Sequence, residues 1–251
     1  MTPYYDDGIC VIYQADVRAV DLLADVDTVV TSPPYNSGVG YDVADDALSP
    51  GDYRSLAGSS ATAMAGWLVG RSGRAWVNVG VTVLHVWLDA LAEHGLLAEN
   101  VVCWDYGVAT SNTAWGSWQS PAAPHLRFGW EPVICSRIGS WERTPPPGGE
   151  RWRDQGGDWA ALCRNVWRVP PGASTRSEHP AVMPLELARR CIRLSTWPGQ
   201  TVLDCFAGSG TTLVAARQLG RRAIGIETSE RYCEMAALRL SQGVLDFGGT
   251  A

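Results

Sequence analysis

The segment 201–227 restricts the fold more than any other part of the sequence, which reads TVLDCFAGSGTTLVAARQLGRRAIGIE there. A short apolar run ends at Asp204, the glycine-rich turn FAGSG follows, and Thr211 begins an amphipathic stretch that ends at Gly220. A second apolar run then ends at Glu227. Such a strand–turn–helix–strand unit is typical of α/β proteins, which bind ligands at the carboxyl ends of parallel strands.

The residues of this turn indicate the class of ligand. Gly208 and Gly210 let the backbone approach a ligand closely. The carboxylate of Glu227 is placed to bind ribose hydroxyls, and Asp204 suits a cationic amino group better than a phosphate. The turn lacks the third glycine of a dinucleotide site, because Thr211 and the following threonine replace it. The pattern therefore favours S-adenosylmethionine over a nicotinamide dinucleotide, and a ligand site over a purely structural turn.

Apolar and amphipathic segments alternate along the 251-residue chain, which is the pattern of a single α/β domain over 1–251. Seven apolar runs predict strands, at 9–13, 26–31, 74–79, 97–103, 131–135, 200–205 and 222–227. Five segments predict helices, near 52–70, 82–94, 184–196, 211–219 and 229–241. Between 138 and 182 proline, glycine, arginine and tryptophan dominate and the periodicity fades. We expect an irregular insert there, of the kind that often carries function.

Charge and cysteine content limit the cellular setting and the partners. The net charge of −6 argues against a nucleic-acid partner, but residues 1–60 carry −8 and residues 120–200 carry +4, so the charge is unevenly spread. The seven cysteines are odd in number, widely spaced and without a CxxC pair, which favours reduced thiols in a cytoplasmic protein and no metal site. An apolar run of about 18 residues and the features of a signal peptide are both missing, so no membrane contact is expected.

A second motif, TSPPYN at 31–36, follows the apolar run VDTVV. Together with LDCFAGSGTT at 203–212 it resembles the DNA amino-methyltransferases, which modify the exocyclic nitrogen of cytosine or adenine. The order of the two motifs resembles the circularly permuted beta group of that family. Three further stretches extend the resemblance over most of the chain: YQADV at 13–17, TAWGSWQSPAAPHLRFGWEPVICSR at 113–137, and NVWRVP with HPAVMPLELARRCI between 165 and 192.

The resemblance implies a fold, a cofactor and a set of site residues. The fold is an α/β, Rossmann-like S-adenosylmethionine-dependent methyltransferase sandwich, with a mostly parallel seven-stranded sheet whose last strands form an antiparallel hairpin. Base-binding and catalytic roles fall on Ser32, Pro33, Pro34 and Tyr35. Cofactor-binding roles fall on an acidic turn near the start of the chain and on the glycine-rich region, with the residues Asp16, Asp204, Phe206, Gly208, Gly210, Thr211 and Glu227. The implied cofactor is S-adenosylmethionine and the implied substrate is double-stranded DNA.

The chemistry of an exocyclic amine explains the first motif. Its lone pair is delocalised into the aromatic ring, which makes the nitrogen a poor nucleophile. Ser32 Oγ and the Pro33 carbonyl can accept its protons, and the two prolines, with fixed φ and no N–H, orient that carbonyl. Tyr35 offers a flat face on which a flipped-out base can stack. No cysteine lies near 31–36, so we expect direct in-line methyl transfer without a covalent enzyme intermediate.

Several interpretations of the activity are compatible with these motifs. Ser32 and HPAVMP favour N4 of cytosine, and N6 of adenine is the alternative. A methyltransferase for RNA or for a small molecule would keep the same clamp. A DNA-binding relative without catalysis would fit the acidic charge and Cys205, which stands where the family usually has proline. A nicotinamide-linked oxidoreductase would leave TSPPY unexplained.

The insert 138–182, together with 105–125, is the candidate target-recognition region. Its short length is compatible with a short target or a homodimer, and a cognate restriction endonuclease is a further candidate partner. His179 could cap the 184–196 helix or touch cofactor or DNA, and it receives no catalytic role. Arginines that could contact phosphates or form a solvated face are Arg127, Arg137, Arg143, Arg151 and Arg153. Tryptophans expected mainly in packing are Trp115, Trp118, Trp130, Trp152, Trp159 and Trp167.

Overall fold

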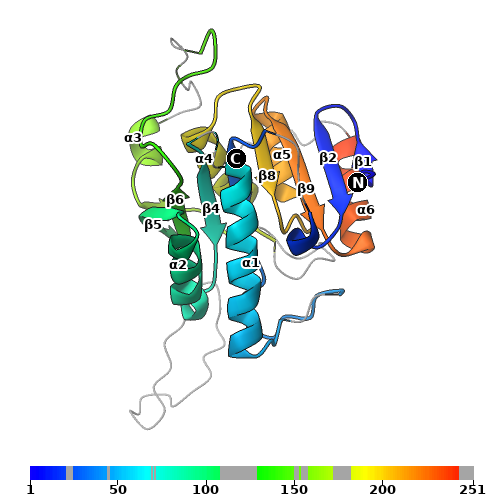
Figure 1. The fold of residues 1–251 in the computed structure, drawn as a ribbon. Helices are drawn as coiled ribbons and strands as arrows, with labels where there is room; N and C mark the ends of the chain where they lie inside the picture. The colour runs from blue at the N-terminus through cyan, green and yellow to red at the C-terminus, as the bar shows by residue number, and fades with distance from the viewer. Residues whose placement is uncertain are drawn as a thin grey trace.

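The computed structural model describes residues 1–20, 25–43, 46–68, 70, 72–107, 129–149, 153, 158–171 and 182–242. Within these residues, nine strands form one mixed sheet in the order β1-β2-β9-β8-β3-β4-β6-β5-β7 (Figure 1). The strands are β1 (Tyr5–Asp6), β2 (Cys10–Gln14), β3 (Thr28–Thr31), β4 (Arg74–Asn78), β5 (Leu97–Asp105), β6 (Trp130–Arg137), β7 (Val166–Arg168), β8 (Thr201–Asp204) and β9 (Arg222–Glu227).

The sheet contains every strand that the sequence predicts, but two more than the seven that the resemblance implied. The additional strands β1 and β7 lie at the edges and have two and three residues, which is too short to give a period in the sequence. From β2 to β4 in the sheet order all neighbours are parallel, whereas β6 is antiparallel to both β4 and β5. An antiparallel pair of consecutive strands is present, but β5 and β6 form it. The expectation that the last strands form it is wrong, because β8 and β9 pair in parallel.

The five predicted helices form with ends within two residues of those expected. They are α1 (Pro50–Leu68), α2 (Leu84–Glu93), α4 (Leu185–Ser195), α5 (Thr211–Gln218) and α6 (Glu230–Ser241). Two 3-10 helices are also present, η1 (Val17–Ala19) and η2 (Val81–Val83). The insert is less irregular than expected, since it holds the short helix α3 (Trp159–Leu162) as well as β7. Asp158 caps α3 by accepting the Ala161 N–H, a local signal that marks its start.

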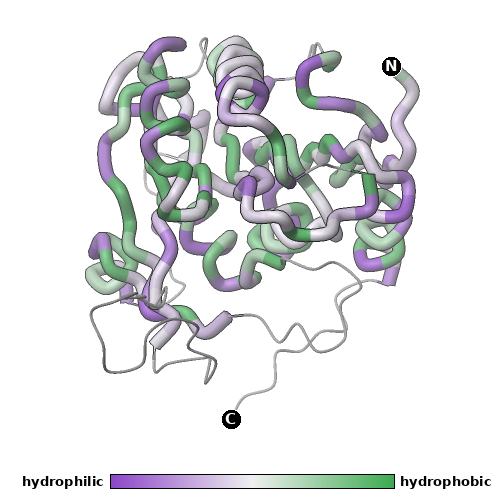
Figure 2. The backbone as a smooth tube through the Cα atoms, turned by 90° about the horizontal axis from the view of Figure 1, so that it is seen from below, coloured by the Kyte–Doolittle hydropathy of each residue, from purple (hydrophilic) through white to green (hydrophobic). Residues whose placement is uncertain are grey.

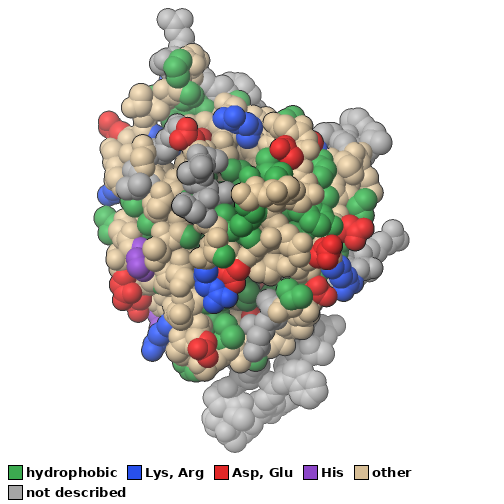
Figure 3. All heavy atoms as spheres, turned by 45° about the vertical axis from the view of Figure 1, so that its right-hand side comes forward, with side chains coloured by type: hydrophobic (Ala, Val, Ile, Leu, Met, Phe, Trp, Pro, Cys, Tyr) green, Lys and Arg blue, Asp and Glu red, His purple; other side chains and the backbone are tan. Residues whose placement is uncertain are grey.

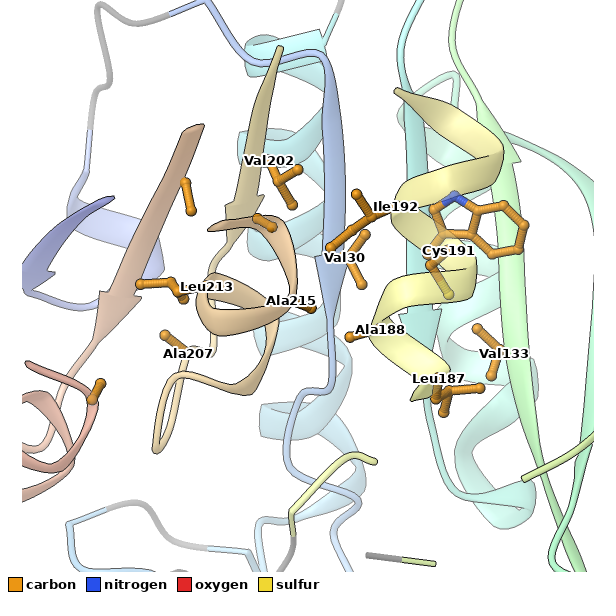
Figure 4. Packing of buried hydrophobic residues seen from close by; sticks show 14 of the residues in the cluster. Val30, Val133, Leu187, Ala188, Cys191, Ile192, Val202, Ala207, Leu213 and Ala215 are labelled. Carbon is orange, nitrogen blue, oxygen red and sulfur yellow. The ribbon is translucent and has the colours of Figure 1, made fainter. Parts of the chain in front are cut away.

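Helices cover both faces of the sheet, because successive residues of a strand point to opposite sides. On one face α4, α5 and α6 pack against strand residues such as Val30 and Val202. Figure 4 shows Ile192 of α4 lying beside Val30 in this layer. On the other face α1 and α2 pack against the adjacent strand residues Val29 and Leu203. The core is therefore two apolar layers separated by the sheet.

The hydropathy of the helices is consistent with this layered arrangement. Figure 2 shows helices that carry both hydrophobic and hydrophilic stretches, as expected for elements with one buried and one exposed face. All seven cysteines are unpaired, in line with the predicted reduced thiols. Among the helices of the described ranges, none has the length and apolar character that crossing a bilayer requires.

Candidate active site

The two sequence motifs meet at one edge of the sheet. Strands β3 and β8 are parallel neighbours, with Val29 opposite Leu203, so both chains leave the sheet on the same side. Thr31, the last residue of β3, donates its hydroxyl hydrogen to Asp204 Oδ1 at 2.7 Å. Ser32 follows Thr31 directly, and Phe206 lies two residues after Asp204. Strand pairing therefore brings together segments that are far apart in the sequence, at the carboxyl ends where α/β proteins bind ligands.

A cavity of about 530 Å³ opens at this edge, which is a usual size for a small-molecule site. It is formed by the loop after β2, the first motif, the start of α1, the glycine-rich turn and the end of β9. Predicted site residues that line it are Asp16, Ser32, Pro34, Tyr35, Asp204, Phe206, Gly208, Thr211 and Glu227. The structure thus gathers nearly all of the predicted residues around one space.

Two predicted site residues, Pro33 and Gly210, do not line the cavity. Pro33 is buried. Gly210 has φ +80°, and a Cβ added there would lie 2.8 Å from Ala236 Cβ of α6. Glycine is required at position 210 by the left-handed backbone and by the close approach of α5 and α6. Its role in this structure is therefore to shape the turn.

Asp204 is the most deeply buried carboxylate of the cavity wall, with 3% of its surface exposed. Besides the Thr31 hydroxyl it accepts the N–H of Phe206 at 3.1 Å. Burial raises the pKa of Asp204 to about 6, and the nearby negative charge of Glu227 adds to the rise. A cation placed beside Asp204 would offset the cost of this buried charge, which agrees with the predicted preference for an amino group.

Glu227 is held in place by backbone N–H groups. Its two oxygens accept the N–H of Gly208 at 2.8 Å and that of Ser229 at 2.9 Å. Burial raises the pKa of this carboxyl above its usual value. The same side chain therefore fixes the glycine-rich turn to the start of α6 and presents its remaining lone pairs to the cavity.

Asp16 has a partner that the sequence reasoning missed. The Arg18 guanidinium donates two hydrogen bonds to the Asp16 carboxylate, with Nε 2.8 Å from Oδ1 and Nη2 2.5 Å from Oδ2. Both residues line the cavity. These hydrogen bonds lower the pKa of Asp16. An amine bound at Asp16 would share the carboxylate with this guanidinium.

The backbone of the first motif is fixed by two buried aromatic residues. Tyr53 of α1 donates its hydroxyl hydrogen to the Pro34 carbonyl at 2.7 Å. Trp87 of α2 donates its Nε1–H to the Tyr53 hydroxyl at 3.0 Å. Both side chains are almost completely buried, so this chain of hydrogen bonds fixes the loop from the helical layer. Neither residue carries a local sequence signal, because apolar helix positions usually indicate packing alone.

Tyr35 makes its polar contacts with neighbouring strands. Its hydroxyl lies 2.7 Å from Glu131 Oε2 and 2.8 Å from Asn78 Oδ1, while Ser32 Oγ donates to it at 3.4 Å. The ring rests on Gly80, where an added Cβ would come within 3.3 Å of the ring. Sequence reasoning assigned no role to Asn78 or Glu131. The polar Asn78 at the end of an apolar run was the available signal.

The loop after the first motif folds around a buried aspartate. Asp46 is 3% exposed and accepts the backbone N–H groups of Asn36 at 2.7 Å and Ser37 at 3.0 Å. Ser229 Oγ, at the start of α6, donates to Asp42 at 2.6 Å and ties the loop to the cofactor half. These bonds bring Tyr41, Val43 and Leu48 into the cavity wall.

Comparison with known proteins identifies the family of this chain. The sequence matches the model of the N6/N4 DNA methylase family over residues 26–238. The chain belongs to this family. It is 32% identical to the Type II methyltransferase M.BglI of Bacillus subtilis, over 66% of this chain and 45% of the relative, so it spans less than half of that protein. It is 27% identical to the Type II methyltransferase M.ScaI of Streptomyces caespitosus, over 95% of this chain and 83% of the relative.

Solved structures with the same fold include DNA methylases. A candidate DNA modification methylase of Thermus thermophilus, in complex with S-adenosyl-L-methionine, has 25% identity and a TM-score of 0.70, covering 96% of this chain and 99% of its own. The cytosine-N4-specific PvuII DNA methyltransferase has 19% identity and a TM-score of 0.71, covering 99% and 90%, and shows the shared fold. Members of this family depend on S-adenosylmethionine, which confirms the predicted cofactor at the level of the family.

The residues that line the cavity fit S-adenosylmethionine. Two carboxylates, Asp204 and Glu227, suit an amino group and ribose hydroxyls, and Phe206 offers an apolar surface between them. Cys205 is 2% exposed, and its Sγ lies 3.7 Å from Thr31 Oγ1. Burial raises the pKa of this thiol, so it stays protonated. A buried, protonated thiol is a poor nucleophile.

Two of the arginines singled out by the sequence, Arg137 at the end of β6 and Arg143 in the insert, pair with carboxylates. Arg137 pairs with Glu99 at 3.1 Å, and the 8% exposed side chain of Arg143 lies 3.7 Å from Asp27 and over the ring of Trp197. The suggestion of a phosphate-contacting strip or a solvated face is therefore wrong for Arg143, which is structural. Figure 3 shows acidic and basic side chains interspersed on the face it displays.

The tryptophans divide between core and surface. Trp167 is 1% exposed and stacks on Trp76 with centroids 5.9 Å apart, as predicted for packing. Trp130 and Trp159 are 38% and 43% exposed, so packing does not account for them.

Arg153 borders a second hollow of about 790 Å³ at the amino ends of β4 and β5. Other residues singled out by the sequence lie outside the described residues, namely Arg127, Arg151, Trp115, Trp118, Trp152 and His179.

Proposed function

We propose that this DNA methylase transfers a methyl group from S-adenosylmethionine to N4 of cytosine in double-stranded DNA. The observation that carries the proposal is the Thr31–Asp204 hydrogen bond, since it joins the amine-binding motif and the cofactor turn at one cavity. When bound, S-adenosylmethionine supplies an electrophilic methyl group on its sulfonium. The assignment to cytosine rests on Ser32 as the first residue of the tetrapeptide.

The residues of the cavity have separate tasks in this proposal. Asp204 binds the cofactor's amino group, Glu227 its ribose hydroxyls and Asp16 its adenine end. Ser32 Oγ lines the cavity and accepts a proton of the target amine, which leaves the nitrogen lone pair directed at the methyl group. Tyr35 supplies the stacking surface for a base rotated out of the duplex. Pro33 is buried and does not line the cavity, so its contribution is to fix the backbone rather than to line the base site.

The finer classification and the partners belong to the same proposal. The first motif precedes the cofactor turn in the chain although their strands β3 and β8 are neighbours, which supports the circularly permuted beta group. The similarity to M.BglI and M.ScaI, both Type II methyltransferases, supports a role in restriction–modification with a cognate endonuclease. The region 138–182 would read the target, in a monomer or a homodimer.

The deciding experiment is methyl transfer from radiolabelled S-adenosylmethionine to unmodified double-stranded DNA, followed by nucleoside digestion and mass spectrometry. We expect label in N4-methylcytosine. Label in N6-methyladenine would keep the mechanism and reverse the base. Cofactor binding without label in DNA would point to RNA or a small molecule as substrate, and loss of both would favour a DNA-binding relative without catalysis.

A further inference from the structure

Glu131 lies outside the cavity and yet determines the surroundings of Tyr35. It is the second residue of β6, the strand that runs antiparallel to its neighbours β4 and β5. Because of this direction, the amino end of β6 lies beside the carboxyl ends of β4 and β5. Three hydrogen-bond donors converge there on the Glu131 carboxylate: Tyr35 Oη at 2.7 Å, Asn78 Nδ2 at 3.3 Å and the hydroxyl of Tyr106.

The direction of these hydrogen bonds follows from the groups involved. A carboxylate accepts hydrogen bonds and donates none, and a phenol has a single hydrogen to give. Tyr35 has two acceptors in reach, Glu131 Oε2 and Asn78 Oδ1, and a bond to the charged acceptor is roughly twice as strong. Burial, together with the charge of Glu131, raises the pKa of Tyr35, so its hydroxyl stays protonated. Tyr35 therefore donates to Glu131.

The orientation of the Tyr35 hydroxyl also determines the direction of its hydrogen bond with Ser32. Since the Tyr35 hydrogen is directed at Glu131, the phenol oxygen accepts from Ser32, whose Oγ donates to it at 3.4 Å. A serine hydroxyl that donates its only hydrogen in this way presents lone pairs on its other side. Ser32 lines the cavity, so the cavity receives a hydrogen-bond acceptor at this point.

We infer that Glu131 is a positioning residue that orients the chain Ser32–Tyr35–Glu131, so that Ser32 accepts a hydrogen from the substrate and Tyr35 keeps its ring in place. The inference rests on the proposed function for its substrate, because a group facing Ser32 must be a donor such as an exocyclic amine. A carbonyl or a ring nitrogen without hydrogen would find no donor there. The hydrogen-bond chain thus selects amine-bearing bases over those that present only acceptors.

The test uses the full chain with the variants Glu131→Gln, Glu131→Ala, Tyr35→Phe and Tyr35→Phe/Glu131→Ala. The first readout needs no DNA: the 13Cζ resonance of Tyr35 in protein labelled at tyrosine Cζ, assigned by its absence in Tyr35→Phe. It should shift in Glu131→Gln, which keeps the shape of the side chain. Glu99→Gln is the matched control, since Glu99 is a buried carboxylate of the same sheet, paired with Arg74 and Arg137 at the other end, and it should leave the Tyr35 resonance unchanged.

The second readout is the single-turnover rate of methyl transfer to unmodified double-stranded DNA. Glu131→Ala should lower it by on the order of 100-fold, because the Tyr35 ring and the Ser32 hydroxyl lose their fixed positions, while the Kd for S-adenosylmethionine stays unchanged. The rate of the double variant should not fall below that of the slower single variant, since both substitutions interrupt the same chain of hydrogen bonds. Glu99→Gln should keep the wild-type rate.

The outcomes distinguish failure of the inference about Glu131 from failure of the proposed function. An unchanged Tyr35 resonance in Glu131→Gln overturns the inference whatever the activity. Wild-type rates in both Glu131 variants, losses that multiply in the double variant, or an equal loss of cofactor affinity overturn it as well. If the Tyr35 resonance shifts in Glu131→Gln as expected but the wild-type protein methylates no DNA, the proposed function fails, and with it the selection of amines, while Glu131 remains the residue that holds Tyr35.

Discussion

Asp204 and Glu227 both end a strand beside the glycine-rich turn, yet their surroundings differ. Asp204 is 3% exposed and accepts one side-chain hydroxyl and one backbone N–H, from Thr31 and Phe206. Glu227 accepts backbone N–H groups on both oxygens. A positive ligand group therefore changes the ionisation of Asp204 more than that of Glu227, whereas loss of Glu227 disturbs the turn itself. These differences lead to separate tests at the scale of single residues.

Substitution should separate binding of the base from binding of the cofactor. Tyr35→Ala should abolish methyl transfer and leave the Kd for S-adenosylmethionine nearly unchanged, because in the proposed function the ring stacks on the base and not on the cofactor. Glu227→Ala should weaken cofactor binding about 10- to 100-fold, the effect of losing hydrogen bonds to a charged group. Calorimetric titration and a methyl-transfer assay on the same preparations measure both. An equal loss of cofactor affinity in the Tyr35 variant would contradict the stacking role, and unchanged affinity in the Glu227 variant would contradict the ribose assignment.

Cofactor affinity should depend on pH through Asp204. Its pKa in the free protein is raised to about 6 by burial. In the proposed function the cofactor's amino group binds the ionised form. Affinity should therefore fall about tenfold per pH unit below 6 and level off above about 7. In the free protein the raised pKa means that the folded state holds this proton more tightly than the unfolded state, so the contribution of Asp204 to stability is lost as the pH rises through about 6.

Titrating S-adenosylmethionine into the protein between about pH 5 and pH 8 checks this dependence. The matched variant is Asp204→Asn, which keeps the shape and cannot ionise. It should bind weakly at every pH and show a flat profile. A wild-type profile that is equally flat would remove Asp204 from the cofactor's amino group.

At the scale of elements, α5 and α6 approach each other at one glycine. Gly210→Ala should lower the free energy of unfolding by at least about 1–2 kcal/mol, because alanine is strained at φ +80° and its Cβ would lie 2.8 Å from Ala236. The control is Gly58→Ala in the middle of α1, where an added Cβ meets nothing within 4 Å. It should raise stability by about 0.5–1 kcal/mol. Urea unfolding of both variants measures the difference, and equal effects would refute the packing argument.

Helices and strands with a clear hydrophobic periodicity were predictable from the sequence. Short elements whose positions depend on neighbouring strands were not. Alternation and apolar runs predicted the seven longer strands, and helix ends were marked by residues such as Gly220. β1, β7 and α3 have two to four residues, too few for a period, and their positions depend on the strands beside them. The site shows the same division. Asp204 and Ser32 follow from local motifs, whereas Glu131 reaches Tyr35 only because β6 inserts between β4 and β5.

At the scale of the whole molecule, local structure decides what each charge does. Net charge is −6, and the arginines between 120 and 200 suggested a basic surface. In the structure Arg143 lies 3.7 Å from Asp27, the residue before β3, and donates to the Ser195 carbonyl at the end of α4. It thereby joins the insert to the central sheet and to a helix.

Removing Arg143 should therefore affect stability rather than DNA binding. Arg143→Ala should lower the free energy of unfolding by on the order of 3 kcal/mol, because Asp27 stays buried without its cation. The slope of log affinity for DNA against log salt should stay at the wild-type value, since a buried guanidinium reaches no phosphate. Arg164→Ala, at an exposed position of the same region, is the control and should keep wild-type stability. A shallower salt slope in Arg143→Ala with unchanged stability would restore the phosphate-contacting role.

The Thr31–Asp204 hydrogen bond spans 173 positions of the sequence. The ribosome synthesises the tetrapeptide 32–35 well before β8, the strand that pairs with β3 and completes the cavity. Contacts of such long range form late in folding, after the closure of large loops. A truncated product that ends before β8 therefore carries the first motif without the glycine-rich turn. If the proposed function holds, methyl transfer begins only after the glycine-rich turn has been synthesised, and partial chains leave DNA unmodified.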